Sequence, residues 1–350
     1  MTKHMHGGDV YKYKDCLDFS ANLNPLGTPE SVKQAIVKSL DHIAQYPQVG
    51  CDILREKIAE YEGVQKDEVI CGNGAAEVIF TLCRAVNPKK ALIPAPTFAE
   101  YGQALHSTGC ELEYYMLTEN AGFVLGEEYL DILHKGLDMA FLCNPNNPTG
   151  MLIPHRLLKR ILEKCRKLDI LLVVDECFLD FVKEPDAYSL KRSLSGFNNL
   201  FILKAFTKRY AMAGVRLGYG LCSNRKLLEK MELCVQPWNV STMAQAAGIQ
   251  ALTETEYVEN GRQTVFQESQ WLKEEMTRIG YQVFPSEANY IFFKGPEELF
   301  GFCLRKRILI RDCSNYPGLT KGFYRIAVKT HEENVKLIEV LEGGILWQKQ

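Results

Sequence analysis

Short apolar runs alternate with longer amphipathic segments from about residue 67 to residue 221. The runs are almost wholly apolar, as expected for strands that are buried on both faces of a sheet. They comprise residues 91–94, 139–143, 171–175, 200–203 and 218–222. Segments of helical character, such as residues 75–85 and 154–168, lie between them. This alternation predicts an α/β fold in which helices cover a largely parallel sheet.

The pattern changes after Pro237. Helical stretches at 241–253 and 255–279 precede a series of short β-like runs, and a last helix starts at His331. The β-like runs comprise residues 281–284, 290–293, 307–310 and 323–328. We therefore predict a large domain at residues 31–240 and a smaller α+β domain at 241–350. Residues 1–30 have little core of their own, and we expect them to pack on the small domain.

Composition and charge are those of an ordinary globular protein. Of the 350 residues, 46% are hydrophobic and 24% are charged. The 41 basic and 43 acidic residues give a formal net charge of −2, so we expect neither a nucleic-acid nor a membrane partner. No apolar run approaches the ~18 residues that span a bilayer, and the first residues lack the apolar stretch of a secretory signal.

The cysteines and early histidines give no sign of a metal centre. None of the twelve cysteines forms a Cys-x-x-Cys pair, so we expect reduced thiols in a cytoplasmic protein. His4 and His6 lack further ligands at a suitable spacing. We therefore predict no metal site.

A glycine-rich segment, residues 71–77, follows one apolar run and opens a helix. Small residues such as Gly74 let a ligand approach the backbone, and the free N–H groups of a helix N-terminus attract phosphate. A plain tight turn into a helix explains the segment equally well. The segment half resembles a dinucleotide fingerprint, but Glu77 stands in place of the third glycine.

Three further motifs stand at the ends of predicted strands, where α/β proteins bind ligands. Phe98 can stack on a flat ring or fill the core. Residues 144–150 form a turn rich in Asn, Pro and Gly, in which a side-chain amide can contact a ring oxygen. Asp175 can pair with a pyridine nitrogen, although a helix cap or a metal ligand is an alternative, and Glu176 is more readily solvated or structural.

Lys208 is the most informative residue of the chain. Thr207 stands directly before it, and Arg216 follows eight residues later in a Gly-x-Arg-x-Gly-Tyr turn. A lysine amine can bind an aldehyde covalently, while a hydroxyl and a guanidinium can hold a phosphate. A solvated basic loop is the alternative for this segment alone. Together these motifs predict bound pyridoxal 5′-phosphate. In order along the chain they are a glycine-rich segment that can hold phosphate, an aromatic ring, an amide, an acid, a lysine and an arginine.

These motifs resemble those of fold-type I pyridoxal phosphate enzymes in the class I/II aminotransferase superfamily, over nearly the whole chain. The resemblance implies covalent attachment at Lys208, with Asp175 on the pyridine nitrogen, Asn147 on the ring oxygen and Phe98 against the ring. It also implies a phosphate site made by Ala75, Ala76, Thr207 and Arg216. Tyr46 matches a tyrosine that reaches the cofactor phosphate of the partner subunit, which implies a homodimer.

More specific segments resemble a decarboxylase branch that is related to the histidinol-phosphate aminotransferases. They are residues 6–8, 17–27 and 310–319. The resemblance implies that Arg325 binds the substrate α-carboxylate. It further implies that three residues surround the rest of a small phosphorylated amino acid, namely His6, Asn22 and Arg311.

Two positions depart from the superfamily pattern. Ala205 stands where a hydroxyl three residues before the lysine is usual, so one phosphate contact is missing and falls to water or to Lys204. Phe178 stands where aminotransferases of this group commonly have a tyrosine, which favours the decarboxylase branch.

The resemblance leaves two reactions open. The first is decarboxylation of L-threonine O-3-phosphate to (R)-1-aminopropan-2-yl phosphate for cobalamin biosynthesis, and it is the one that we expect. The second is transamination of the histidinol-phosphate type, with 2-oxoglutarate as acceptor. A binding or regulatory protein on the same fold is a third possibility, but it predicts loss of the lysine, and Lys208 is present.

Overall fold

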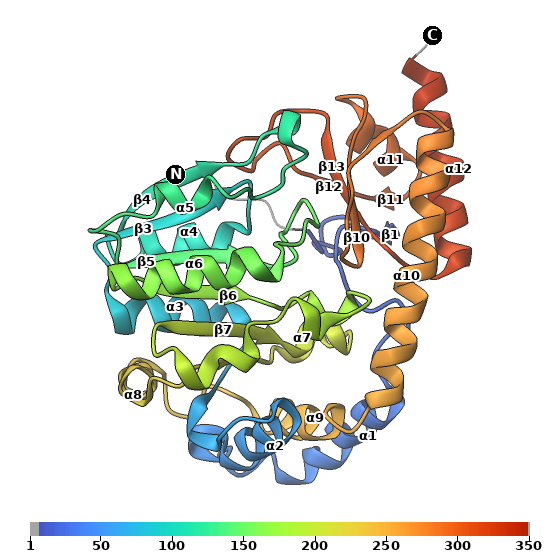
Figure 1. Ribbon diagram of the computed structural model, residues 1–350. Coiled ribbons are helices and arrows are strands. Elements are labelled where there is room, and N and C mark those ends of the chain that lie inside the picture. The colour runs from blue at the N-terminus through green and yellow to red at the C-terminus, as the bar shows by residue number, and fades with distance from the viewer. Residues whose placement is uncertain (1–6, 349–350) are drawn as a thin grey trace.

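A seven-stranded sheet forms the centre of the larger part of the computed structural model, which describes residues 7–348 (Figure 1). Its strand order is β2-β8-β7-β6-β5-β3-β4. The strands are β2 (Val69–Gly72), β3 (Lys90–Ala95), β4 (Glu111–Met116), β5 (Met139–Cys143), β6 (Leu171–Asp175), β7 (Leu200–Ala205) and β8 (Gly218–Leu221). Neighbours pair in parallel except β8, which is antiparallel to β7 and to β2. The predicted α/β fold with a largely parallel sheet is confirmed.

Helices bury both faces of this sheet, and strand β5 shows why its sequence is continuously apolar. Met139 and Phe141 pack into one core with α3 (Ala75–Val86), α4 (Ala99–His106) and α8 (Arg225–Cys234). Ala140 and Leu142 pack into the opposite core with α6 (His155–Leu168). Alternate residues of a strand point to opposite faces, so a sheet covered on both sides needs apolar residues at every position.

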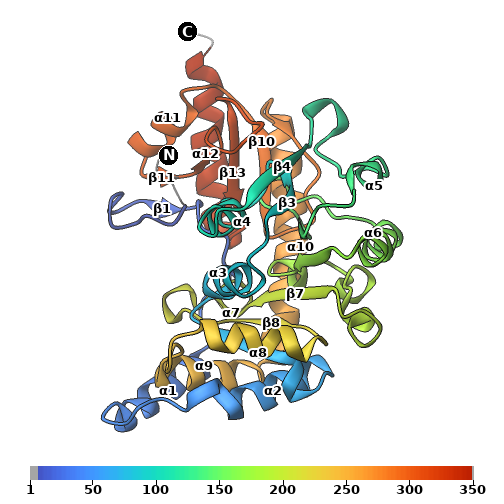
Figure 2. The same ribbon diagram turned by 90° about the vertical axis from the view of Figure 1, so that its left-hand side faces the viewer.

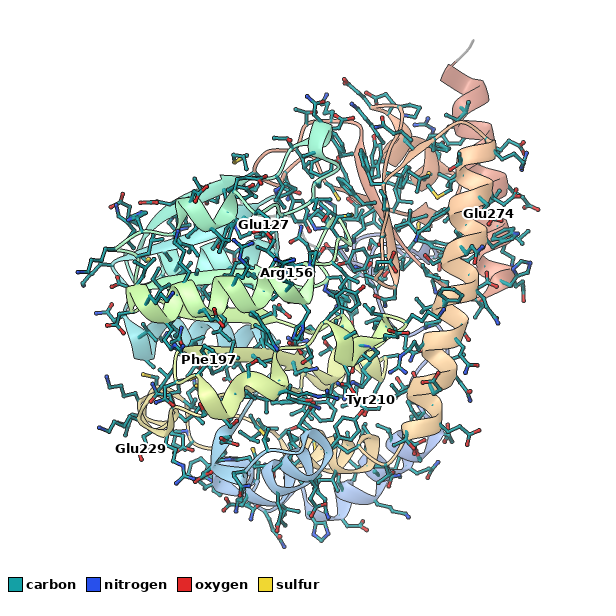
Figure 3. The ribbon with its side chains drawn as sticks, viewed as in Figure 1. Glu127, Arg156, Phe197, Tyr210, Glu229 and Glu274 are labelled. Atoms are coloured by element: carbon teal, nitrogen blue, oxygen red, sulfur yellow. The ribbon has the colours of Figure 1, made fainter. Side chains whose placement is uncertain are left out.

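The helices turn their charged residues away from these cores. Glu229 on α8 and Glu274 on α10 (Thr255–Arg278) are exposed, and Figure 3 shows them on the outside of the fold. The remaining short helices of the larger part are α5 (Tyr129–Ile132) and α7 (Phe206–Arg209). Within residues 7–348, no helix combines the length and the apolar character needed to cross a bilayer.

A four-stranded antiparallel sheet forms the second centre of the molecule, with the order β12-β13-β10-β9. The strands are β9 (Gln282–Val283), β10 (Tyr290–Lys294), β12 (Arg311–Asp312) and β13 (Phe323–Ala327). Residues of α10, α11 (Leu299–Arg305) and α12 (His331–Gln348) share its core. Figure 2 shows this sheet and its helices at the end of the molecule opposite α1 (Glu30–Ser39), α2 (Asp52–Glu62) and α9 (Thr242–Ala251).

The segment before α1 joins the two centres. Strand β1 (Leu17–Asp18) pairs in parallel with β11 (Ile308–Leu309), and Phe19 lies in the core of the small sheet. Farther on, Asn24 donates its backbone N–H to the carbonyl of Lys208 at 3.0 Å and its amide to the carbonyl of Arg209 at 2.9 Å. Helix α9 packs against α1 and α2. The domain boundaries at residues 30 and 240 stay a prediction.

Candidate active site

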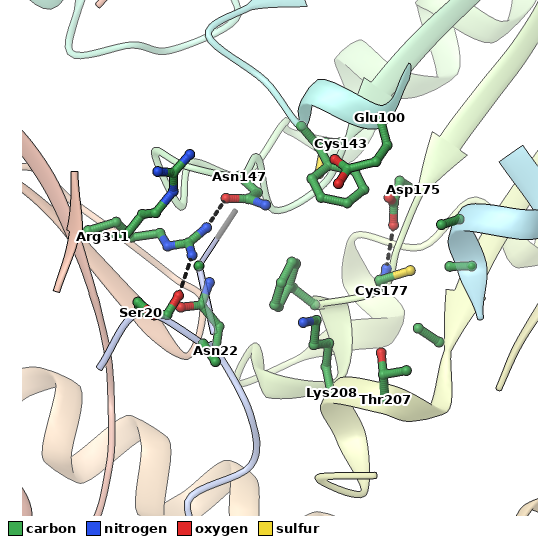
Figure 4. Close-up of a pocket in the computed structure, with 18 of the residues that line it drawn as sticks. Ser20, Asn22, Glu100, Cys143, Asn147, Asp175, Cys177, Thr207, Lys208 and Arg311 are labelled. Atoms are coloured by element: carbon green, nitrogen blue, oxygen red, sulfur yellow. Dashed lines mark hydrogen bonds between the residues drawn. The ribbon is translucent and has the colours of Figure 1, made fainter. Parts of the chain in front are cut away.

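A pocket of about 250 Å³ opens where β5, β6 and β7 end, and residues of β12, β13 and the early segment close its other side. In Figure 4 the side chains of Asn147, Asp175 and Lys208 converge on it from different parts of the chain. Eleven of the predicted site residues line it: Asn22, Ala75, Ala76, Phe98, Asn147, Asp175, Thr207, Lys208, Arg216, Arg311 and Arg325. The carboxyl ends of parallel strands thus bring together motifs that are distant in sequence.

Lys208 lies on α7, which begins directly after β7. Burial lowers the pKa of its amine to about 8, because it removes the water that solvates the ammonium, and the charges of Arg325 and Arg216 act in the same direction. About a tenth of the amine is therefore neutral at pH 7, far more than for a lysine with the ordinary pKa. A neutral amine is the form that attacks an aldehyde.

Asp175 ends β6 and is buried. Its Oδ1 accepts the backbone N–H of Cys177 at 2.9 Å, and its Oδ2 accepts the hydroxyl of Tyr101 at 2.5 Å. Burial raises the pKa of this carboxyl, while these hydrogen bonds and the charge of Lys208 oppose the rise. A carboxylate in this position can pair with a protonated ring nitrogen.

The residues between β2 and α3 form a cradle for an anion. Gly74 has φ +83°, and a Cβ at that position would collide with the guanidinium of Arg216. A Cβ at Gly218 would likewise collide with the backbone of Ala75. Glycine therefore lets Arg216 and the strand β8 approach the N-terminus of α3, where free N–H groups and the helix dipole favour a phosphate.

Arg325, on β13, is held by two residues from earlier parts of the chain. Its guanidinium donates to Oδ1 of Asn147 and, at 2.8 Å, to the carbonyl of Ser20. Its Nε is buried and has no hydrogen-bond partner among the described residues, and Oδ1 of Asn22 is in the same state. Buried polar atoms are nearly always paired, so these two atoms indicate the place of a polar ligand.

Arg311, on β12, provides a guanidinium in the same pocket, in addition to those of Arg216 and Arg325. It donates to Oδ1 of Asn315 at 2.9 Å and lies 5.3 Å from the ring centroid of Tyr316. With Arg216 at the anion cradle, the other two arginines of the pocket suit a ligand that carries two separate anionic groups.

Three predicted site residues are not part of this lining. Gly74 lies next to the guanidinium of Arg216, which does line the pocket. Tyr46 is 78% exposed and stacks on Trp238 with ring centroids 4.3 Å apart, outside the pocket of its own chain. His6 lies outside the described residues. The role of each predicted residue stays a prediction.

The structure distinguishes between the alternatives expected for two neighbouring residues. Lys204 does not replace the phosphate contact that Ala205 lacks: Ala205 lines the pocket, whereas Lys204 is buried 3.2 Å from Oε2 of Glu176. Successive residues of a strand point to opposite faces, so the two side chains cannot both reach the pocket. Glu176 is structural and not solvated, because it also accepts hydrogen bonds from Ser189 and Leu190.

Sequence reasoning missed Tyr101, Cys177 and Tyr316, each of which touches the pocket or one of its polar groups. A signal existed for Tyr101, because it follows Phe98 by three residues at the start of a helix, a spacing that places two side chains on one face. Their rings meet edge to face, with centroids 5.4 Å apart. Cys177 contributes its backbone N–H, which a pattern of side chains cannot predict.

A buried lysine of lowered pKa, a buried carboxylate and an anion cradle at the end of a parallel sheet fit pyridoxal 5′-phosphate. The molecule has the architecture of a fold-type I pyridoxal phosphate enzyme. The family profile for aminotransferase class I and II matches residues 14–341. The chain belongs to this family, and it is a pyridoxal phosphate-dependent enzyme.

Individual relatives cover nearly the full length. The chain is 38% identical to threonine-phosphate decarboxylase of Salmonella typhimurium, over 97% of this chain and 96% of the relative. It is 32% identical to histidinol-phosphate aminotransferase of Methanosphaera stadtmanae, over 93% of this chain and 89% of the relative. The crystal structure of histidinol-phosphate aminotransferase from Clostridium acetobutylicum superposes with a TM-score of 0.88 at 30% identity, covering 94% and 99% of the two chains.

Proposed function

We propose that this protein decarboxylates L-threonine O-3-phosphate, giving (R)-1-aminopropan-2-yl phosphate and carbon dioxide for cobalamin biosynthesis. The observation that carries the proposal is the pair of arginines, Arg311 and Arg325, in one pocket with Lys208. An amino acid phosphate has two anionic groups at opposite ends, and each guanidinium can take one of them. The 38% identity to a threonine-phosphate decarboxylase supports this choice of substrate.

The proposed roles follow from position. Arg325 holds the α-carboxylate, because its Nε is unpaired and Asn147 and Ser20 fix its orientation. Arg311 and Asn22 hold the phosphate. For His6, which lies outside the described residues, the same role rests on the sequence resemblance alone. When bound, pyridoxal phosphate supplies an electron-accepting ring that stabilises the charge left on the substrate Cα as carbon dioxide departs. Lys208, in its ammonium form, then donates to that carbon the proton that takes the place of the departed carbon dioxide.

Transamination of the histidinol-phosphate type is the second candidate function, and the similarity to histidinol-phosphate aminotransferases favours it. A single assay separates the two. The holoenzyme is incubated with L-threonine O-3-phosphate without any oxo acid, and with histidinol phosphate plus 2-oxoglutarate. Stoichiometric carbon dioxide in the first mixture is expected; glutamate in the second mixture, with no carbon dioxide in the first, would overturn the proposal.

The Lys208→Ala variant tests the covalent role of the lysine in the same assay. We expect no turnover and no borohydride-stabilised adduct at that position. Undiminished turnover would contradict it.

The Arg311→Met variant tests which arginine binds the phosphate. If the assignment holds, kcat/KM for threonine phosphate falls steeply, whereas the low value for unphosphorylated threonine stays unchanged. Arg325→Met, in contrast, impairs both substrates, because both carry the α-carboxylate. An equal loss on both substrates in the Arg311→Met variant would contradict the assignment.

We also propose a homodimer in which Tyr46 reaches the cofactor phosphate of the partner subunit. The support is a set of exposed apolar side chains in the same stretch of sequence: Val37, Leu40, Ile43, Val49 and Ile53 are 48–66% exposed. Such a concentration of exposed apolar residues is typical of a protein interface. A second copy of the chain would cover it.

Mixed dimers test the shared site. A Lys208→Ala subunit paired with a Tyr46→Ala subunit carries both defects in one site and none in the other, if Tyr46 acts across the interface. Mixing two poorly active variants then restores activity. If Tyr46 acts within its own subunit, each site has one defect and mixing restores nothing.

The state of the cysteines supports a cytoplasmic location. All twelve are free thiols, and ten of them are buried. Reduced thiols are typical of the cytoplasm, where disulfides are rare.

A further inference from the structure

The hydroxyl of Tyr101 is directed at the carboxylate that faces the cofactor position. It lies 2.5 Å from Oδ2 of Asp175, and both residues are buried. The other carboxylate oxygen accepts the N–H of Cys177. Charge-assisted hydrogen bonds of this length in a water-poor environment are stronger than neutral ones.

The ring of Tyr101 is fixed independently of its hydroxyl. It stacks on Phe141 of β5 with centroids 5.0 Å apart and an interplanar angle of 19°. Its edge meets Phe98 at 5.4 Å and 75°. Tyr101 therefore connects the aromatic residue proposed to cover the cofactor ring with the acid proposed to pair with the ring nitrogen.

We propose that Tyr101 is a positioning residue whose hydroxyl holds the Asp175 carboxylate in place and in its ionised form, ready to pair with a protonated ring nitrogen. The proposal rests on the role proposed for Asp175. Tyr101, on α4, thus affects the cofactor only through the side chain of Asp175.

The charge balance around Asp175 explains why a hydroxyl is needed. The titratable groups that face it from neighbouring elements are Tyr101 on α4, Cys143 on β5, Cys177 after β6, Lys208 on α7 and Tyr290 on β10. Among them only Lys208 brings positive charge, and that amine is partly neutral near pH 8. Burial raises the pKa of Asp175 above its ordinary value, and the hydrogen bonds from Tyr101 and Cys177 act against that rise.

The test is Tyr101→Phe, which removes one oxygen and keeps the ring stacking. A hydrogen bond to a charged group corresponds to about one pKa unit or more, so the acidic limb of the kcat/KM profile should move up by about one pH unit. The bound cofactor should dissociate about tenfold faster from the diluted holoenzyme, as followed by its visible absorbance. Tyr129→Phe is the matched control, because that buried hydroxyl has no hydrogen-bond partner among the described residues.

Asp175→Asn separates failure of this inference from failure of the site assignment. If Asp175→Asn retains cofactor and turnover like the wild type, the proposed role of Asp175 is wrong. If Asp175→Asn is impaired but Tyr101→Phe changes neither the acidic limb nor cofactor loss, only the inference about Tyr101 is overturned. If Tyr101 acts through the carboxylate charge, Tyr101→Phe adds little in the Asp175→Asn background; a full additional loss there would also overturn it.

Discussion

Replacing Lys204 by methionine should destabilise the fold while leaving the cofactor site intact. The Lys204 ammonium lies 3.2 Å from Oε2 of Glu176, and the two side chains are 6% and 0% exposed. Burial acts to lower the pKa of Lys204, but the carboxylates of Glu176 and Glu62 outweigh it and raise the pKa above the ordinary value. Methionine fills a similar volume without the charge, so Glu176 would lose its cationic partner.

The size of this destabilisation depends on the hydrogen bonds that Glu176 retains. Removing one partner of a buried ion pair costs about 3–5 kcal/mol, because the other charge stays buried. Glu176 would still accept hydrogen bonds from Ser189 Oγ at 2.8 Å and from the Leu190 N–H at 3.0 Å. We therefore expect the lower end of that range, about 3 kcal/mol in the free energy of unfolding.

Urea unfolding of the holoenzyme at fixed protein concentration measures this free energy. Lys66→Met is the control, since the Lys66–Asp52 pair is exposed and should contribute less than about 1 kcal/mol. The double variant Lys204→Met/Glu176→Gln should recover stability, because neither charge is then left alone. A Lys204→Met loss below about 1 kcal/mol would refute the reasoning. Weakened cofactor binding in the Lys204→Met variant would instead indicate that Lys204 contributes to the phosphate site.

Two further predictions concern the cofactor site and acid stability. Ala205→Ser restores a hydroxyl beside the cradle and should tighten cofactor binding about tenfold, as measured by equilibrium dialysis. Burial acts to raise the pKa of Glu62, but Lys204, Arg209 and Lys191 lower it from 4.5 to about 2. Its stabilisation, about 3 kcal/mol, is thus full above pH 4.5 and lost as the pH falls towards 2. Glu62→Gln should show that loss at neutral pH in urea unfolding, and the difference from wild type should vanish near pH 2.

The elements that sequence predicted best are those whose burial is uniform. The run at 139–143 is apolar throughout because β5 is covered on both faces, and its predicted bounds match the strand. Strand β4 was missed because it is the sheet edge and carries Glu111, Glu113 and two partly exposed tyrosines. The reversed direction of β8 also gave no signal, since pairing direction depends on partners that are distant in sequence.

The site divides in a similar way. Lys208, Asp175 and Asn147 stand in recognisable motifs at strand ends, so pattern and resemblance located them. The sequence did not reveal which residues form hydrogen bonds with the side chains of the site. The hydroxyl of Tyr101 reaches Asp175 from 74 positions away, and Arg325 reaches the Ser20 carbonyl from 305 positions away. Such contacts depend on tertiary packing, which no local pattern encodes.

The bridge from Arg325 to the Ser20 carbonyl and Asn147 has a consequence for synthesis of the protein. Every strand of the large sheet has been synthesised once residue 221 is made, whereas β13 is among the last elements to be synthesised. A nascent chain can therefore form the large sheet and α7, which carries Lys208, before Arg325 has been synthesised. The role proposed for Arg325 implies that the carboxylate site is complete only after residues near the C-terminus pack against Ser20, so a chain that ends before β13 should be inactive.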